Sequence, residues 1–250
     1  MFDHHIEQAA GLLIAAHRSG TRLDALPIAC QPATVEEAHA IQDRMIAALG
    51  EPVAGWKLAF GPDGSLIRGP LLASRVFLSP AQIDPGLVPL LGAEAEIAFR
   101  FDRPLPPRVS DYDYEEVADA VTAFAAIEIV DSRFISYQEA PFLHRLADFM
   151  SNGAFIKGLA QPNWRDLNLS ELHVNLCING TSIVDHHGGH SSRDPLLPAV
   201  AFVNNFRKRS GVLAGQVVTT GTYTGLNFAK PGQSIEVSFI GFDSVKVFFK

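Results

Sequence analysis

The sequence is poor in cysteine and in long apolar runs, and each shortage excludes a class of protein. Only two cysteines, Cys30 and Cys177, occur in 250 residues, so we expect no disulfide framework and interpret both as reduced, buried side chains. No apolar run approaches the roughly 20 residues that a membrane-spanning helix needs. The first residues lack the positive segment and apolar core of a secretory signal. We therefore expect a cytoplasmic protein that does not bind membranes.

Basic residues are also too few and too scattered for a nucleic-acid-binding surface. Twenty Lys and Arg stand against 27 Asp and Glu, which gives a net charge of −7 at pH 7. The longest basic cluster, Arg207-Lys208-Arg209, fits the last turn of a helix. No His or Cys residues have zinc-site spacing, whereas 47% hydrophobic residues suffice for a large core. The composition predicts a globular protein and argues against a nucleic-acid partner.

The chain divides into a helical beginning, residues 1–52, and a β-rich domain, residues 53–250, which we expect to form one compact unit. Apolar residues have helical spacing over 5–18. A second helix is predicted to begin at Thr34, which forms a capping box with Glu37, and to end at Gly50. Further helices are predicted at 114–124 and 197–209.

Strand patterns dominate after Gly50, and Asn179-Gly180 predicts a tight hairpin between two of them. We expect strands at 55–60, 95–101, 126–130, 154–159, 173–178, 182–185, 217–220, 235–240 and 245–249. Strands and helices do not alternate regularly, which argues against a dinucleotide-binding fold or a (β/α)8 barrel. The pattern predicts an α+β fold built mainly of β-sheet.

Two carboxylates interrupt the apolar run 91–101. Because alternate strand side chains share a face, Glu94 and Glu96 should point to one side, and Ile97 and Phe99 to the other. A solvated sheet face would explain this pair. A functional site would require a third carboxylate to converge on it.

Glu128 is the candidate for that third carboxylate. It lies in the almost continuous apolar run 124–130, which is typical of a strand buried on both faces. A nearby cation from Lys or Arg, protonation, or a bound divalent metal ion would each relieve the cost of burying its charge. Mg²⁺ or Mn²⁺ prefers such oxygen ligands, so Glu94, Glu96 and Glu128 form a candidate metal site.

Four short motifs occur in the order and approximate spacing of one enzyme family. They are Gly55-Trp56-Lys57, Glu94-Ala95-Glu96, the segment 128–133 and Thr220-Gly221-Thr222. With these motifs, and over nearly its whole length, the sequence resembles the 2-keto-4-pentenoate hydratase family. That family includes 2-oxo-3-hexenedioate (4-oxalocrotonate) decarboxylases and belongs to the fumarylacetoacetase C-terminal domain superfamily.

The resemblance implies a mixed β-sheet roll or sandwich with a helical N-terminal region. It implies that Glu94, Glu96 and Glu128 hold Mg²⁺ or Mn²⁺ and that Lys57 transfers protons. Because Trp56, Leu58 and Phe60 surround Lys57 in sequence, we expect an apolar setting to lower its pKa. The implied reaction is hydration of a 2-hydroxy-2,4-dienoate to a 4-hydroxy-2-oxo acid in aromatic catabolism.

Several residues are predicted to contact the substrate. Arg133 is a candidate for binding a carboxylate, together with Asp131, although a structural ion pair is an alternative for both. Thr220 and Thr222 could meet the substrate carboxylate or could be part of an ordinary strand-to-loop transition. Arg68 follows a segment shorter than in familiar hydratases and could select a second carboxylate or lie exposed.

Other polar residues have simpler interpretations. His186, His187 and His190 could bind a transition metal, but their Gly- and Ser-rich surroundings favour an exposed loop. Lys157 could offset the acidic cluster or extend to the surface. His144 has no evident partner.

The same site could serve other functions. A decarboxylase of the family is the first alternative, and a C–C hydrolase of the superfamily would need an activated water that no evident His/carboxylate pair supplies. A homologue that binds a 2-oxo acid or an assembly partner without catalysis is the third. The resemblance implies a homo-oligomer, possible pairing with a homologous decarboxylase, and a role for the apolar stripe of the N-terminal helices in association.

Overall fold

The computed structural model describes residues 1–250. Two helices open the chain, α1 (Asp3–Ser19) and α2 (Val35–Leu49). Thr34 accepts a hydrogen bond from the Glu37 backbone N–H at 3.2 Å, as predicted, whereas the Glu37 carboxylate accepts from Ala33 instead of closing the box. Gly50 ends α2 in the left-handed conformation.

The N-terminal helices bury their apolar stripes within the molecule. Leu13 of α1 and Ile41 and Met45 of α2 are fully buried in one hydrophobic cluster. That cluster also includes Leu146 of the short helix α4 (Phe142–Ala147) and Ile67 of strand β2 (Leu66–Leu72). The stripe that we expected to serve association is therefore occupied by intramolecular packing.

The main sheet has the strand order β2-β1-β10-β5-β6-β7-β3, and β11 also pairs with β5. Its strands are β1 (Val53–Phe60), β2, β3 (Val76–Leu78), β5 (Gly92–Phe101), β6 (Val121–Val130), β7 (Asn152–Gln161), β10 (Val217–Thr222) and β11 (Asn227–Phe228). The β1–β10 and β3–β7 pairs are parallel, and the other pairs are antiparallel. The resulting sheet is mixed, as predicted.

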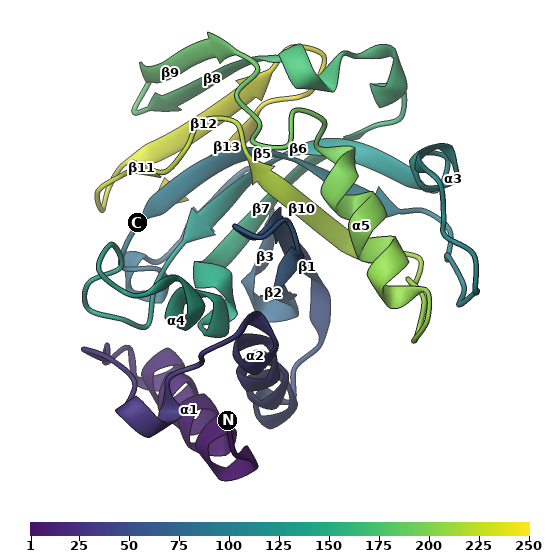
Figure 1. The fold of residues 1–250 in the computed structure, drawn as a ribbon. Coiled ribbons are helices and arrows are strands. Elements are labelled where there is room, and N and C mark those ends of the chain that lie inside the picture. Colours follow the sequence, from purple (N-terminus) through teal and green to yellow (C-terminus); the bar gives the residue numbers. More distant parts are fainter.

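A second sheet packs over β6 and β7 (Figure 1). Its order is β4-β13-β12-β8-β9, from β4 (Ala81–Ile83), β8 (His173–Ile178), β9 (Thr181–His187), β12 (Ser234–Phe239) and β13 (Val245–Phe249). Ile127 on β6 and Val237 and Val247 on the second sheet are fully or almost fully buried in the core between the layers. Helix α5 (Leu196–Phe206) packs on β1, β2 and β10, and α3 (Tyr114–Ala118) packs on α5.

The structure differs from the sequence prediction most clearly in two segments. Residues 121–124 belong to β6 and not to a helix: the capping box of Asp113 and Glu116 starts α3, but the helix ends at Ala118. The run 121–130 is instead buried along almost its whole length in the middle of the sheet. Residues 66–72, which we had not assigned to a strand, form β2 as the antiparallel partner of β1.

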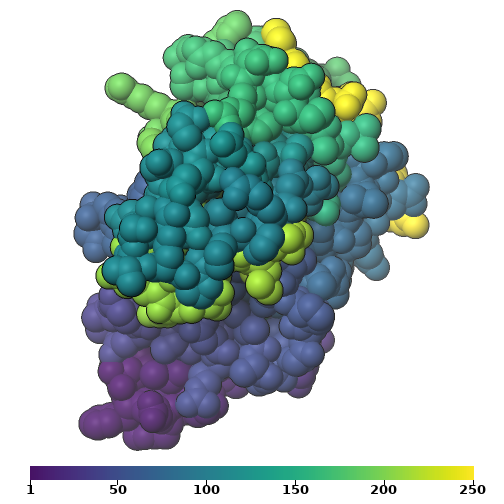
Figure 2. Space-filling view, turned by 90° about the vertical axis from the view of Figure 1, so that its right-hand side faces the viewer, coloured from purple at the N-terminus to yellow at the C-terminus, as the bar shows by residue number.

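The N-terminal helices form one end of the molecule and the second sheet the other (Figures 1 and 2). No helix is long and apolar enough to cross a membrane. The two cysteines are free, and Cys177 is half-buried where we had expected full burial.

Candidate metal centre and active site

Three glutamates converge on one face of the main sheet. Glu94 on β5 lies directly opposite Glu128 on β6, and Glu96 follows two residues along β5 on the same face. One carboxylate oxygen of each lies within 4.8 Å of the others. Glu96 and Glu128 are fully buried, which excludes the solvated face that the sequence left open. Like charges directly opposite one another destabilise a sheet unless a cation compensates them.

Lys57 supplies part of that compensation from β1. Its Nζ lies 2.9 Å from Glu128 Oε2 and 3.6 Å from Glu94 Oε2. Burial would by itself lower the pKa of Lys57, but the attraction of Glu128, Glu94 and Glu96 raises it above its ordinary value. Our expectation of a lowered pKa is therefore wrong for this arrangement, because the attraction of the three carboxylates outweighs the effect of burial. Lys57 carries its proton here.

The glutamates remain under-compensated. Burial raises the pKa of Glu96 well above its ordinary range, and repulsion from Glu128 and Glu94 adds to that effect. Burial also raises the pKa of Glu128, against the opposing attraction of Lys57. Three carboxylates that face one ammonium group hold excess negative charge, which protonation or a further cation would relieve.

The hydrogen bonds around the carboxylates leave ligand positions open. Asn152 Nδ2 donates to Glu128 Oε1 at 2.9 Å, and the Thr219 hydroxyl donates to Glu96 Oε2. Glu96 Oε1 is buried and has no hydrogen-bond partner, and Glu128 Oε2 has only its ionic contact with Lys57. An oxygen-only donor set with orphaned, buried carboxylate atoms fits a hard divalent cation.

A strained turn places Asn152 beside the glutamates. Phe149, Met150 and Ser151 have φ values of 51°, 55° and 59°, which residues with side chains seldom adopt. Gly69 on β2 allows this turn to approach, since a Cβ at that position would lie 2.5 Å from the Phe149 carbonyl oxygen. No sequence pattern singled out Asn152, and Thr219 directly precedes the motif that pointed to Thr220 and Thr222.

A pocket opens beside Lys57 between β2, α4 and the strained turn. Its volume is about 150 Å³. Ile67, Phe142, Leu146 and Met150 form its apolar wall. Ser151 also lines the pocket, and its hydroxyl oxygen is buried without a partner. The pocket can therefore enclose a small, mostly apolar ligand next to Lys57.

The structure does not bring Arg68 to the carboxylates. Arg68 pairs with Leu58 across the β1–β2 ladder, whereas Lys57 pairs with Gly69, so the Arg68 and Lys57 side chains leave opposite faces of the sheet. The guanidinium lies 4.6 Å from the centre of the Trp56 ring, and Nη2 bonds Asp43 Oδ1 at 2.7 Å. The Arg68 side chain therefore contacts residues of helix α2 and strand β1 and not the three glutamates.

Asp131 and Arg133 are engaged in separate structural ion pairs. Asp131 Oδ1 accepts from Arg22 Nη2 at 2.8 Å and from the Leu90 backbone N–H at 3.1 Å. Arg133 pairs with the buried Asp148 and donates through Nη1 to the Asn152 carbonyl at 3.0 Å. These contacts fit the structural ion pairs that we gave as the alternative to substrate binding. Arg133 also fixes the turn that carries Asn152.

The predicted hydroxyls of Thr220 and Thr222 bond backbone carbonyl groups and do not bond the glutamates. Thr220 donates to the Ile97 carbonyl at 3.3 Å, and Thr222 donates to the Ala95 carbonyl at 3.5 Å. It is Thr219, together with the Gly221 backbone N–H at 3.4 Å, that bonds Glu96.

The three clustered histidines differ in their surroundings. His186 and His187 lie exposed at the end of β9, in agreement with an exposed setting. His190 is buried, which the loop prediction missed, and its Nε2 lies 3.0 Å from the Thr220 carbonyl oxygen. It therefore supports the strand segment beside Glu96. Lys157 is half-buried and forms no ion pair with the carboxylates.

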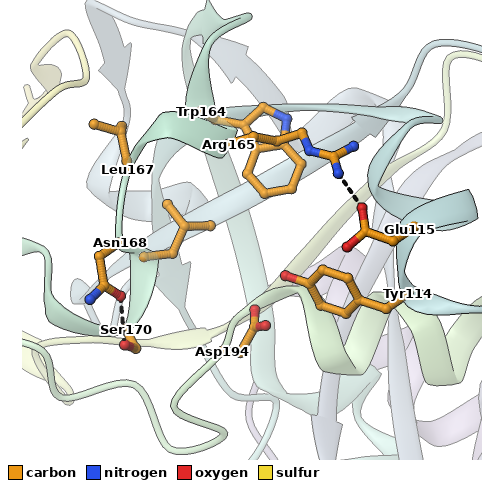
Figure 3. Close-up of a pocket in the computed structure, with 9 residues that line it drawn as sticks. Tyr114, Glu115, Trp164, Arg165, Leu167, Asn168, Ser170 and Asp194 are labelled. Carbon is orange, nitrogen blue, oxygen red and sulfur yellow. Dashed lines mark hydrogen bonds and ion pairs between the residues drawn. The ribbon is translucent and has the colours of Figure 1, made fainter.

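Another cavity, of about 300 Å³, lies between α3 and the segment 164–170 (Figure 3). Its polar groups mostly satisfy one another: Arg165 pairs with Glu115, and Ser170 donates to Asn168 at 2.8 Å. Neither Lys57 nor any of the three glutamates lines it. The pocket beside Lys57 is the better candidate for chemistry.

Comparison with known proteins places this chain in one enzyme family. The family described as fumarylacetoacetate (FAA) hydrolase C-terminal matches residues 62–247. The chain is 27% identical over 260 residues to the 2-keto-4-pentenoate hydratase of Paraburkholderia xenovorans (strain LB400), covering 98% of this chain and 94% of that protein. It is 30% identical over 159 residues to a 4-oxalocrotonate decarboxylase of Pseudomonas putida, covering 62% of this chain and 59% of that protein.

The fold also matches a solved structure along its entire length. The 4-oxalocrotonate decarboxylase from Pseudomonas putida G7, complexed with magnesium and adipate, superposes with a TM-score of 0.86 at 20% identity. The alignment covers 100% of this chain and 99% of that one. The α+β fold with curled mixed sheets is therefore shared.

Proposed function

Because the chain belongs to the fumarylacetoacetate hydrolase C-terminal family, we propose that it is a divalent-metal-dependent lyase that hydrates a 2-hydroxy-2,4-dienoate. The product is a 4-hydroxy-2-oxo acid, as in aromatic catabolism. The observation that carries the proposal is the convergence of Glu94, Glu96 and Glu128 with Lys57 beside a small pocket.

The three glutamates hold Mg²⁺ or Mn²⁺ in this proposal. Their oxygen-only donor set, their full or near burial and the orphaned Glu96 Oε1 support that assignment. When bound, such a cation supplies Lewis-acid stabilisation of negative charge on the C2 oxygen of a 2-oxo acid. Asn152 and Thr219 orient the carboxylates through their hydrogen bonds.

Lys57 handles the proton transfers at the reacting carbons. Lys57 lines the pocket and is protonated, so it is placed to donate a proton at C5 while the 2-hydroxyl loses its own, which converts the 2-hydroxy-dienoate into its 2-oxo-3-enoate tautomer. Water then adds at C4 and a proton at C3, which balances the reaction as hydration. The apolar wall of the pocket limits other water from reaching the carbon chain.

Decarboxylation of 2-oxo-3-hexenedioate is the second candidate. The 30% identity to a 4-oxalocrotonate decarboxylase supports it, and loss of carbon dioxide forms an enolate that the same site could stabilise. A C–C hydrolase has less support, because no histidine lines the pocket to activate water.

The two activities can be separated by one assay. Purified protein is given 2-hydroxypenta-2,4-dienoate or 2-oxo-3-hexenedioate with and without Mg²⁺, and ultraviolet absorbance and carbon dioxide are followed. Metal-dependent loss of the diene without carbon dioxide supports hydration, whereas release of carbon dioxide supports decarboxylation. No metal-dependent change with either acid would remove both proposals.

We also propose that copies of this chain associate into a homo-oligomer. Large apolar side chains lie exposed away from the pocket, among them Leu78, Leu159 and Ile240, each more than 60% exposed. Light scattering coupled to size-exclusion chromatography tests this, and a monomeric mass at micromolar concentration would contradict it.

A further inference from the structure

Arg145 on α4 is a half-buried cation without an anionic partner. Its side chain makes no ion pair and no hydrogen bond, whereas Arg133 and Arg68 bond carboxylates. The other arginines without a side-chain partner, Arg18, Arg193 and Arg209, are exposed to water. The Arg145 guanidinium therefore lacks the anionic partner that the other half-buried or buried arginines of this region have.

The Arg145 side chain belongs to the pocket beside Lys57. Phe142, Arg145 and Leu146 have the spacing that places side chains on one face of a helix, and all three line the pocket. The Arg145 guanidinium carbon lies 5.3 Å from the centre of the Tyr137 ring, a cation–π contact that orients it. The lining contains two cations, Lys57 and Arg145, and no acidic side chain.

These charges favour a ligand with two anionic ends. Under the proposed function, on which this inference rests, the first carboxylate and C2 oxygen of the substrate bind at the glutamate site. A monocarboxylic dienoate would then leave Arg145 unpaired beside a hydrocarbon end. A second carboxylate would match the planar guanidinium, with which it can form two parallel hydrogen bonds.

We propose that Arg145 binds the far carboxylate of the substrate and makes this enzyme selective for dicarboxylic 2-hydroxy-dienoates and 2-oxo acids. Ser151, whose buried hydroxyl lacks a partner, offers a further donor along the same pocket. Arg145 thus takes the role that the sequence had suggested for Arg68, which lies on the opposite face of the sheet.

Binding of two saturated acids tests the proposal without any turnover. 2-Oxoadipate and 2-oxohexanoate have six carbons each and differ only in the terminal carboxylate, so calorimetry on the Mg²⁺-loaded protein isolates its contribution. We expect 2-oxoadipate to bind at least about tenfold more tightly, the range of a hydrogen-bonded charge pair. Arg145→Gln should remove most of that preference, whereas Arg103→Gln, at an exposed arginine outside the pocket, should keep it.

Kinetics give an independent reading. With Arg145→Gln, kcat/KM should fall about tenfold or more for a dicarboxylic dienoate, mainly through KM, and by a clearly smaller factor for 2-hydroxypenta-2,4-dienoate. Equal binding of the two saturated acids by the unmodified protein, or a preference that survives in Arg145→Gln, would overturn the role of Arg145. Absence of turnover together with an Arg145-dependent binding preference would overturn the hydratase proposal and support this one.

Discussion

Lys57 shows how much a buried side chain depends on its neighbours in space. In sequence it is flanked by apolar residues, yet its nearest charged groups are carboxylates on β5 and β6. Because those carboxylates hold its proton, Lys57 acts first as a proton donor in the proposed reaction. It also reduces the charge repulsion within the glutamate cluster.

We predict that Lys57→Ala abolishes turnover without preventing metal binding. Loss of a general acid typically costs about 10²- to 10⁴-fold in rate, whereas removal of an ammonium group from the carboxylates leaves their attraction for Mg²⁺ intact or stronger. Steady-state kinetics and calorimetric Mg²⁺ titration measure the two effects. Lys246→Ala, at a surface lysine paired with Glu236, is the matched control, and full activity of Lys57→Ala would contradict the assignment.

At the scale of elements, the site depends on close contact between β2 and the strained turn at 149–151. Gly69 permits that contact, and Arg133 and Asp148 hold the turn from the other end. The turn in turn positions Asn152 against Glu128. An element far from the glutamates in sequence thus fixes their geometry.

Gly69→Ala should therefore lower both stability and activity. The added Cβ would lie 2.6 Å from Met150 Cβ as well as against the Phe149 carbonyl, so the turn must move. We expect a loss of about 1–3 kcal/mol in the free energy of unfolding and reduced turnover. Gly11→Ala in α1 has open space around its Cβ and should be neutral or stabilising by up to about 1 kcal/mol. Urea unfolding of both variants measures the change in unfolding free energy. Equal stability of Gly69→Ala and Gly11→Ala would contradict the steric argument.

The contact between α2 and β2 should respond to pH through His39. Burial and then repulsion from Arg68 lower the pKa of His39 to about 4, and its Nε2 accepts from the Arg68 backbone N–H at 3.3 Å. A depressed pKa in the folded state means that this contribution to stability is present above pH 6.5 and is lost as the pH falls toward 4.

We predict that His39→Gln weakens this pH dependence, because glutamine keeps an acceptor and does not titrate. Between pH 7 and pH 4.5 the variant should lose about 1–2 kcal/mol less unfolding free energy than the unmodified protein, after allowance for partial exposure. Urea unfolding at each pH provides the measurement. His186→Gln, at an exposed histidine, serves as the control. If the unfolding free energy of all three proteins varies with pH in the same way, half-buried His39 does not cause the pH dependence.

At the scale of the whole molecule, the glutamate cluster is a local weakness that a cation should relieve. Excess buried negative charge lies at the centre of the main sheet, between strands that also form the core against the second sheet. Binding of a cation to the folded state alone stabilises it by mass action. Stability and metal binding should therefore be coupled.

We predict that Mg²⁺ raises the melting temperature and that a chelator reverses the effect. At about 100 times the dissociation constant the gain is about 2.7 kcal/mol, which corresponds to roughly 5–10 °C for a chain of this size. Glu96→Gln should lose most of the shift, and Glu236→Gln, an exposed glutamate on β12, should retain it. An undiminished shift in Glu96→Gln, recorded by differential scanning calorimetry, would place the metal elsewhere.

The sequence by itself determined the periodic and local features. Alternation placed Glu94 and Glu96 on one face, the apolar run predicted the burial of Glu128, and Thr34 and Gly50 bounded α2. The order and spacing of four short motifs predicted the enzyme family. These features are readable because strand period, capping and burial are imposed by residues close together in the chain.

The tertiary structure decided which side chains meet. Strand pairing placed Arg68 on the face opposite Lys57. Tertiary packing brought Arg145 and Ser151 to the pocket, and Asn152 to Glu128, from segments without a readable signal. It also reversed the expected pKa shift of Lys57. Register, the packing of α4 and the electrostatic field of distant carboxylates arise only when strands remote in sequence pair, so local pattern could not reveal them.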